Sequence, residues 1–162
     1  AVALAPIVVG AALYGPSAGA YLGLVMGIVV FVSGLFGWDG GFVLYLMSQN
    51  AWATVLICLG KTAAAGWLAG IVYRAASGKK ELTGVILGGI TCPVVNTGLF
   101  IAGMCAYFFP ALQGMAASQG PEVMYYIIFG IAGINFIIEL FVNMALASGI
   151  TRIIQAGRHP LD

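Results

Sequence analysis

Apolar residues run along this chain in long uninterrupted blocks, not in the period-two alternation that marks a half-buried strand. Short polar or glycine-rich stretches separate five such blocks, at 2–14, 17–36, 52–73, 82–109 and 123–154. Continuous apolar runs of about 20 residues are typical of transmembrane helices, whereas membrane β-strands alternate over about ten residues. The pattern therefore predicts an all-α integral membrane protein with one membrane domain over residues 1–162.

The first block is shorter than a bilayer requires. It holds 13 residues before the Gly15-Pro16 turn, and a span needs about 20. No basic stretch precedes it, so it does not have the pattern of a signal peptide. We therefore expect this block to be the end of a longer helix in a fragment that lacks an upstream membrane segment. In the fourth block, Pro93 predicts a kink that frees backbone groups near mid-span.

Composition supports a membrane location and removes several classes of function. Hydrophobic residues make up 62% of the chain and charged residues 7%, against about 45–50% and about 25% in soluble domains. A net charge of +1 excludes a nucleic-acid-binding surface. A single histidine, His159, and three cysteines without C-x-x-C spacing predict no metal site. No P-loop occurs, and the G-x-S-x-G at Gly15–Gly19 does not stand between a strand and a helix, so we expect no enzymatic activity, no catalytic residues and no cofactor.

The basic residues predict an orientation in the membrane. Five of the six lie after the third block or at and beyond the end of the fifth: Arg74, Lys79, Lys80, Arg152 and Arg158. With five spans, both places fall on one side, and the loops 37–51 and 110–121 on the other side carry no Lys or Arg. The positive-inside rule then puts the C-terminus in the cytoplasm and both loops outside.

Small residues predict close contacts between helices. Two series of glycines occur, Gly19-x-x-x-Gly23-x-x-x-Gly27 in the second block and Gly60, Gly66 and Gly70 in the third. Glycines at every fourth position let two backbones approach closely. The contact lies either within this chain or between two copies of it.

Two charged residues fall inside predicted spans. Lys61 lies about nine residues into the third block, and Glu139 lies near the middle of the fifth. A charge at this depth is costly and marks a functional site or an ion pair. The two residues therefore either pair with each other and lock the helices, or line a polar ligand site.

Side-chain amides accompany the two charges. Asn96 and Thr97 lie mid-span in the fourth block, and Asn135 and Asn143 lie four residues before and after Glu139, on the same helix face. Because an Asn side chain both donates and accepts hydrogen bonds, this set suits recognition of a polar small molecule.

The outer loop 37–51 is rich in aromatic residues, among them Trp38 and Tyr45. Aromatic side chains at this position either anchor the chain at the membrane surface or belong to a lid over a pocket.

Several short motifs follow one another along the chain. They are Ala5-Pro6-Ile7-Val8-Val9-Gly10, Tyr14-Gly15-Pro16-Ser17-Ala18-Gly19, Lys61, Ala69-Gly70-x-x-Tyr73-Arg74, Asn96-Thr97-Gly98-Leu99-Phe100 and Gly133-Ile134-Asn135-x-x-x-Glu139. In this order they resemble the substrate-binding S components of energy-coupling factor (ECF) vitamin transporters. The branch that they resemble includes the pantothenate-, pyridoxine- and hydroxymethylpyrimidine-type S components.

The resemblance implies a six-helix bundle with both termini in the cytoplasm, of which this chain would hold five helices and lack the N-terminal one. It implies a multi-pass protein of the bacterial plasma membrane that captures a vitamin or related nutrient from outside. Its partners would be the lipid bilayer, a membrane T component and two ATPase subunits.

The resemblance also implies a substrate-binding set, which comprises Lys61, Asn96, Thr97, Asn135, Glu139, Trp38 and Tyr45. Phe136-Ile137-Ile138-Glu139 stands where many relatives have Gly-x-Pro-Glu, which puts a bulkier apolar wall near the site. Lys61 would suit a carboxylate ligand such as pantothenate, and Glu139 an amine or hydroxyls, as in pyridoxine-like ligands. Two other functions fit the residues: a standalone secondary transporter or channel, and a structural membrane protein without a ligand.

Overall fold

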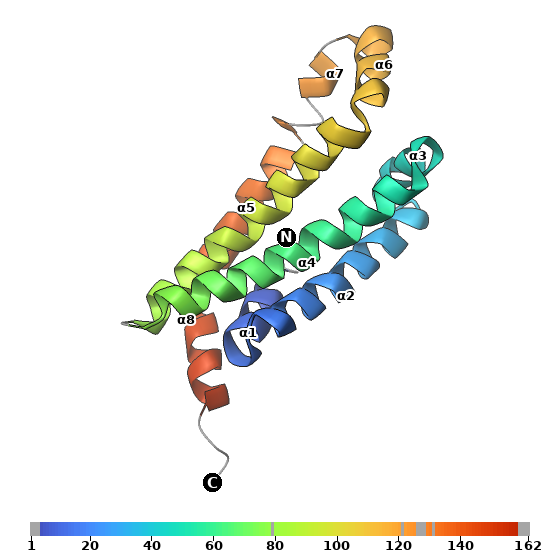
Figure 1. Ribbon diagram of the computed structural model, residues 1–162. Helices are drawn as coiled ribbons and strands as arrows, with labels where there is room; N and C mark the ends of the chain where they lie inside the picture. Colours follow the sequence, from blue (N-terminus) through green and yellow to red (C-terminus); the bar gives the residue numbers. More distant parts are fainter. Residues whose placement is uncertain (1–3, 79, 121, 126–128, 131, 159–162) are drawn as a thin grey trace.

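The computed structural model describes residues 4–78, 80–120, 122–125, 129–130 and 132–158 (Figure 1). Lys79 and His159 therefore lie outside the described residues. Every regular element in the described ranges is a helix, which confirms the all-α prediction. The helices are α1 (Ala5–Tyr14), α2 (Pro16–Leu35), α3 (Phe42–Gln49), α4 (Ala51–Ala76), α5 (Glu81–Tyr107), α6 (Phe109–Gln119), α7 (Glu122–Tyr125) and α8 (Ala132–Arg158).

Four of the described helices, α2, α4, α5 and α8, are long and apolar enough to cross a membrane. They indicate a multi-pass membrane protein. The apolar helix α1 has 10 residues, so it is about 15 Å long, half of the roughly 30 Å that a bilayer core requires. The count of five spans is therefore not confirmed, and the missing N-terminal helix stays a prediction.

The long helices form a bundle around α1, which packs against α2, α4, α5 and α8. The C-terminal end of α2, together with α3, α6 and α7, lies at one end of this bundle (Figure 1). The turn between α4 and α5 and the C-terminal end of α8 lie at the other (Figure 1). The described basic residues other than Lys61 lie toward this second end, which we call the basic end: Arg74, Lys80, Arg152 and Arg158.

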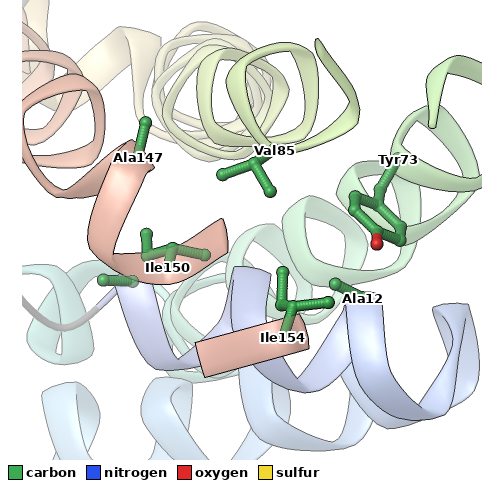
Figure 2. Packing of buried hydrophobic residues seen from close by; sticks show 7 residues of the cluster. Ala12, Tyr73, Val85, Ala147, Ile150 and Ile154 are labelled. Atoms are coloured by element: carbon green, nitrogen blue, oxygen red, sulfur yellow. The ribbon is translucent and has the colours of Figure 1, made fainter. Parts of the chain in front are cut away.

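A cluster of buried side chains holds the basic end together (Figure 2). Tyr73 of α4 and Val85 of α5 pack there with Ala147, Ile150 and Ile154 of α8, and Ala5 and Ala12 of α1 complete the cluster. Four helices thus share one apolar core.

The glycines of α2 pack within the chain. Gly19, Gly23 and Gly27 are buried and face the backbone of α4, so a methyl group added to Gly23 would overlap the carbonyl of Thr62. Gly66 and Gly70 of α4 lie equally close to the first turns of α2, whereas Gly60 faces open space. The intramolecular interpretation therefore holds for these helices, except at Gly60.

The opposite side of α2 exposes bulky apolar residues, including Leu24, Val25, Ile28 and Val29. A helix that buries glycines and exposes branched side chains reverses the pattern of soluble proteins. It fits a surface that faces lipid, where close backbone packing replaces hydrophobic burial.

Two stretches predicted as loops contain helices. In 37–51, the carboxylate of Asp39 accepts the backbone N–H of Gly41 at 3.0 Å and that of Val43 at 2.8 Å, which caps the start of α3. In 110–121, Pro110 occupies the first turn of α6, where its missing N–H costs no hydrogen bond. Polar and glycine residues in both stretches concealed these short helices.

The fifth predicted span contains a long membrane helix. The block 123–154 includes the short helix α7, and α8 covers its described residues from Ala132 onward. Residues 126–128 and 131 are outside the described ranges. The start of the predicted span therefore stays a prediction.

Candidate functional site

A cavity of about 170 Å³ lies between α3, α4, α5 and the start of α8, away from the basic end. Its polar or charged lining residues are Asp39, Lys61, Asn96, Thr97 and Asn135, and its apolar ones are Val30, Phe42, Val43, Leu46, Ile57, Cys58, Phe100 and Ala132. Ligand pockets for drug-sized molecules occupy about 300–1,000 Å³, so this cavity of about 170 Å³ suits only a molecule smaller than those.

Four of the seven predicted site residues line this one cavity. Lys61 comes from α4, Asn96 and Thr97 come from α5, and Asn135 comes from α8. Helices that are distant in sequence therefore bring their polar mid-span residues to one place. Their role in substrate binding stays a prediction.

Glu139 lies buried behind the cavity lining. Its Oε1 accepts a hydrogen bond of 2.9 Å from Nδ2 of Asn135, one helical turn away. Asn96 is also in range to interact with this carboxylate. Glu139 is only 5% exposed, so it supports the lining residues and would reach a ligand only through a shift of Asn135 or Asn96.

Trp38 and Tyr45 are not among the lining residues. The side chain of Trp38 is 82% exposed, and its ring lies 6.4 Å from that of Phe36, measured between centroids. Tyr45 is on α3, and its side chain is partly exposed. The exposure of Trp38 fits the membrane-anchor interpretation better than the lid interpretation.

The segment that contains these aromatics nevertheless closes the cavity. Asp39, Phe42, Val43 and Leu46 line it, and they stand at positions i, i+3, i+4 and i+7. This spacing is the stripe of one helix face and could have identified the cover from the sequence. That this segment acts as a lid stays a prediction; the side chains of the segment that line the cavity are not Trp38 or Tyr45.

Lys61 does not form the predicted ion pair with Glu139. Its Nζ instead lies 4.9 Å from the centroid of the Phe100 ring. Among the described residues, neither Lys61 nor Glu139 has an ion-pair partner. The face of an aromatic ring attracts a cation but forms no ion pair with it, so Lys61 contributes a basic group beside the cavity that has no acidic partner among the described residues.

Aromatic rings form one wall of the cavity. The Phe42 and Phe100 rings lie 6.3 Å apart between centroids at an interplanar angle of 53°. Phe100 stands four residues after Asn96, so both project from the same face of α5. The site therefore presents an ammonium group, amides and an apolar wall to one small volume.

Three buried oxygen atoms lack a hydrogen-bond partner among the described residues: Oδ1 of Asn96, which lines the cavity, and Glu139 Oε2 and Asn143 Oδ1 on α8. A buried acceptor without a donor is costly. No group of three or more His, Cys, Asp or Glu side chains in the described part of the chain could hold a metal ion. The spare acceptors therefore suit hydrogen-bond donors.

In comparisons with known proteins, no family model matched the sequence, no curated protein matched it, and no solved structure matched the chain. The resemblance to S components therefore rests on the sequence motifs alone.

Proposed function

We propose that this chain is the substrate-binding membrane subunit of an ECF-type importer, which captures a vitamin or related small nutrient from outside the cell. The observation that supports this most is the Lys61 ammonium, which lines the cavity without an acidic partner among the described residues. An intramembrane charge without a partner marks a ligand pathway or site more often than a structural contact.

The position of the cavity supports capture from outside. The lining of the cavity includes residues of α3, and α3 lies at the end of the bundle opposite the basic end (Figure 1). If the positive-inside rule places the basic end in the cytoplasm, the cavity lies toward the external medium. The helix α3 then covers it from that side.

The charges of the lining favour an anionic ligand. Both carboxylate oxygens of Asp39 already accept backbone N–H groups, and Glu139 lies behind Asn135. Lys61 is thus the charged side chain whose hydrogen-bonding capacity remains for a ligand. A carboxylate-bearing nutrient of the pantothenate type fits better than a cationic one, and the amides of Asn96 and Asn135 would bind its hydroxyl or amide groups.

Energy for release would come from partners. Because the sequence holds no P-loop, the proposal assigns ATP hydrolysis to two ATPase subunits, which a membrane T component couples to this chain. The alternatives are a standalone transporter or channel, and a structural protein without a ligand.

The test is equilibrium binding of a panel of B vitamins and their carboxylate-bearing precursors to the purified protein in nanodiscs. The expected result is submicromolar binding of one anionic member, which Lys61→Met abolishes and Lys80→Met, an exposed lysine at the basic end, leaves unchanged. Absence of binding across the panel would reject the proposal. Flux through liposomes without any ATPase would favour the standalone transporter.

A further inference from the structure

The floor of the cavity contains an excess of hydrogen-bond acceptors. Glu139 Oε1 is satisfied by Asn135, but Glu139 Oε2 and Asn96 Oδ1 are both buried without a donor. Asn96 is 6% exposed and Glu139 is 5% exposed, so water has little access to either. The Asn96 side chain lies within interaction range of the Glu139 carboxylate, and one hydrogen atom shared between the two residues would satisfy both acceptors.

No described group forms an ion pair with the Glu139 carboxylate. From α4, Lys61 faces it, but its ammonium lies over the Phe100 ring without forming an ion pair. From α5, Cys92 and Asn96 face it. From α1, which also packs on α8, residues 5–13 carry no titratable side chain.

We propose that Glu139 is a proton-binding site, in which a proton on Oε2 is donated to Oδ1 of Asn96 and links α8 to α5. The proton binds to the carboxylate from water, so that a neutral acid replaces the anion. One O–H group then satisfies both orphaned oxygens, and Glu139 adds no uncompensated negative charge at that depth.

The proton has a consequence for the cavity. With Glu139 neutral, the Lys61 ammonium sets the sign of the electrostatic potential in the cavity. A ligand cation near Asn135 would displace the proton from Glu139. This inference goes beyond nutrient capture and does not depend on it, because the proton site exists in the empty protein.

Infrared spectroscopy of the purified full chain in lipid at neutral pH tests the proposal without any ligand. The wild type should show the C=O stretching band of a protonated carboxylic acid, and Glu139→Gln should lose it. Glu122→Gln, which removes an exposed carboxylate on α7, should leave it intact. If Glu139→Gln instead removes carboxylate bands, the proposal is wrong.

A second variant keeps the test decisive if Glu139→Gln fails to fold. Asn96→Ala removes the acceptor but not the acid, so the carboxylic acid band should shift to higher frequency because its O–H loses a partner. A band that stays at the wild-type frequency in Asn96→Ala would overturn the assignment of Asn96 as the acceptor. Absence of any carboxylic acid band in the wild type would overturn the proton site itself.

Discussion

Nδ2 of Asn143 on α8 donates a 3.0 Å hydrogen bond to the backbone carbonyl of Gly89 on α5. Gly89 is four residues before Pro93, and a proline has no N–H to offer the carbonyl at that position. Asn143 therefore supplies, from another helix, the bond that Pro93 cannot make. Asn143 and Gly89 are both buried, so this contact ties α8 to α5 at the depth where an unpaired carbonyl would cost most.

The first prediction concerns this contact. Asn143→Leu, which is nearly isosteric, should lower the stability of the wild-type bundle by about 0.6–1.7 kcal/mol, the range measured for hydrogen bonds between membrane helices. In a Pro93→Ala background the loss should be smaller, because the substituted alanine can donate its N–H to the Gly89 carbonyl. Thermal unfolding of the two single variants and the double variant in detergent measures this coupling. Equal losses in both backgrounds would show that Asn143 does not compensate for the proline.

The second prediction concerns the glycine contact between α2 and α4. Gly23→Ala should destabilise the protein by about 1–3 kcal/mol, the usual cost of overpacking, because its methyl group would overlap the Thr62 carbonyl. Gly149→Ala is the matched control, since Gly149 lies in the helix α8 with open space around it. It should be neutral or stabilise by up to about 1 kcal/mol through helix propensity. Similar melting temperatures for the two variants would contradict the described packing.

The third prediction concerns the cover of the cavity. Asp39→Ala removes both hydrogen bonds that cap α3, and loss of a cap costs about 0.5–2 kcal/mol. If this cost destabilises the position of α3 over the cavity, the form in which α3 has moved off the cavity becomes about 2- to 30-fold more populated. The maleimide reaction of Cys58, a buried lining residue, should accelerate by a similar factor in a Cys105→Ser background.

Two controls accompany this measurement. Ser48→Ala removes an exposed hydrogen bond within α3 and should leave the reaction rate unchanged. Asp39→Asn retains an acceptor oxygen and should give an intermediate rate. An unchanged rate in Asp39→Ala would mean that α3 does not govern access to Cys58.

The fourth prediction concerns orientation. In intact cells, with Cys105 replaced by Ser, a membrane-impermeant maleimide should label Ser48→Cys on α3 but not Gly78→Cys in the turn between α4 and α5. Both positions are exposed, so accessibility differs only by the side of the membrane. Labelling of Gly78→Cys without permeabilisation would invert the topology and place the cavity toward the cytoplasm.

Much of the fold follows from the apolar pattern, because a long apolar run in lipid has few alternatives to a helix. The sequence also indicated Lys61, Asn96, Thr97 and Asn135 as polar residues inside the predicted spans. The structure brings all four to one cavity. The Gly19, Gly23 and Gly27 series correctly indicated a close helix contact.

The remaining features depend on information that a linear pattern lacks. Depth in the membrane does not fix the direction in which a side chain points, so Lys61 and Glu139 were considered as a pair although Lys61 lies against Phe100. The aromatic composition of 37–51 led to the prediction of Trp38 and Tyr45 as site residues. Instead, Asp39, Phe42, Val43 and Leu46 of the same segment line the cavity.

The central claim is that a small anionic nutrient occupies the cavity beside Lys61. Native mass spectrometry of protein purified gently, without added ligand, tests it most directly. The account predicts a bound small molecule of one defined mass on the wild type and on Lys80→Met, and its loss from Lys61→Met. A bound mass that persists in Lys61→Met would contradict the claim, and so would its absence from the wild type together with no binding across the vitamin panel.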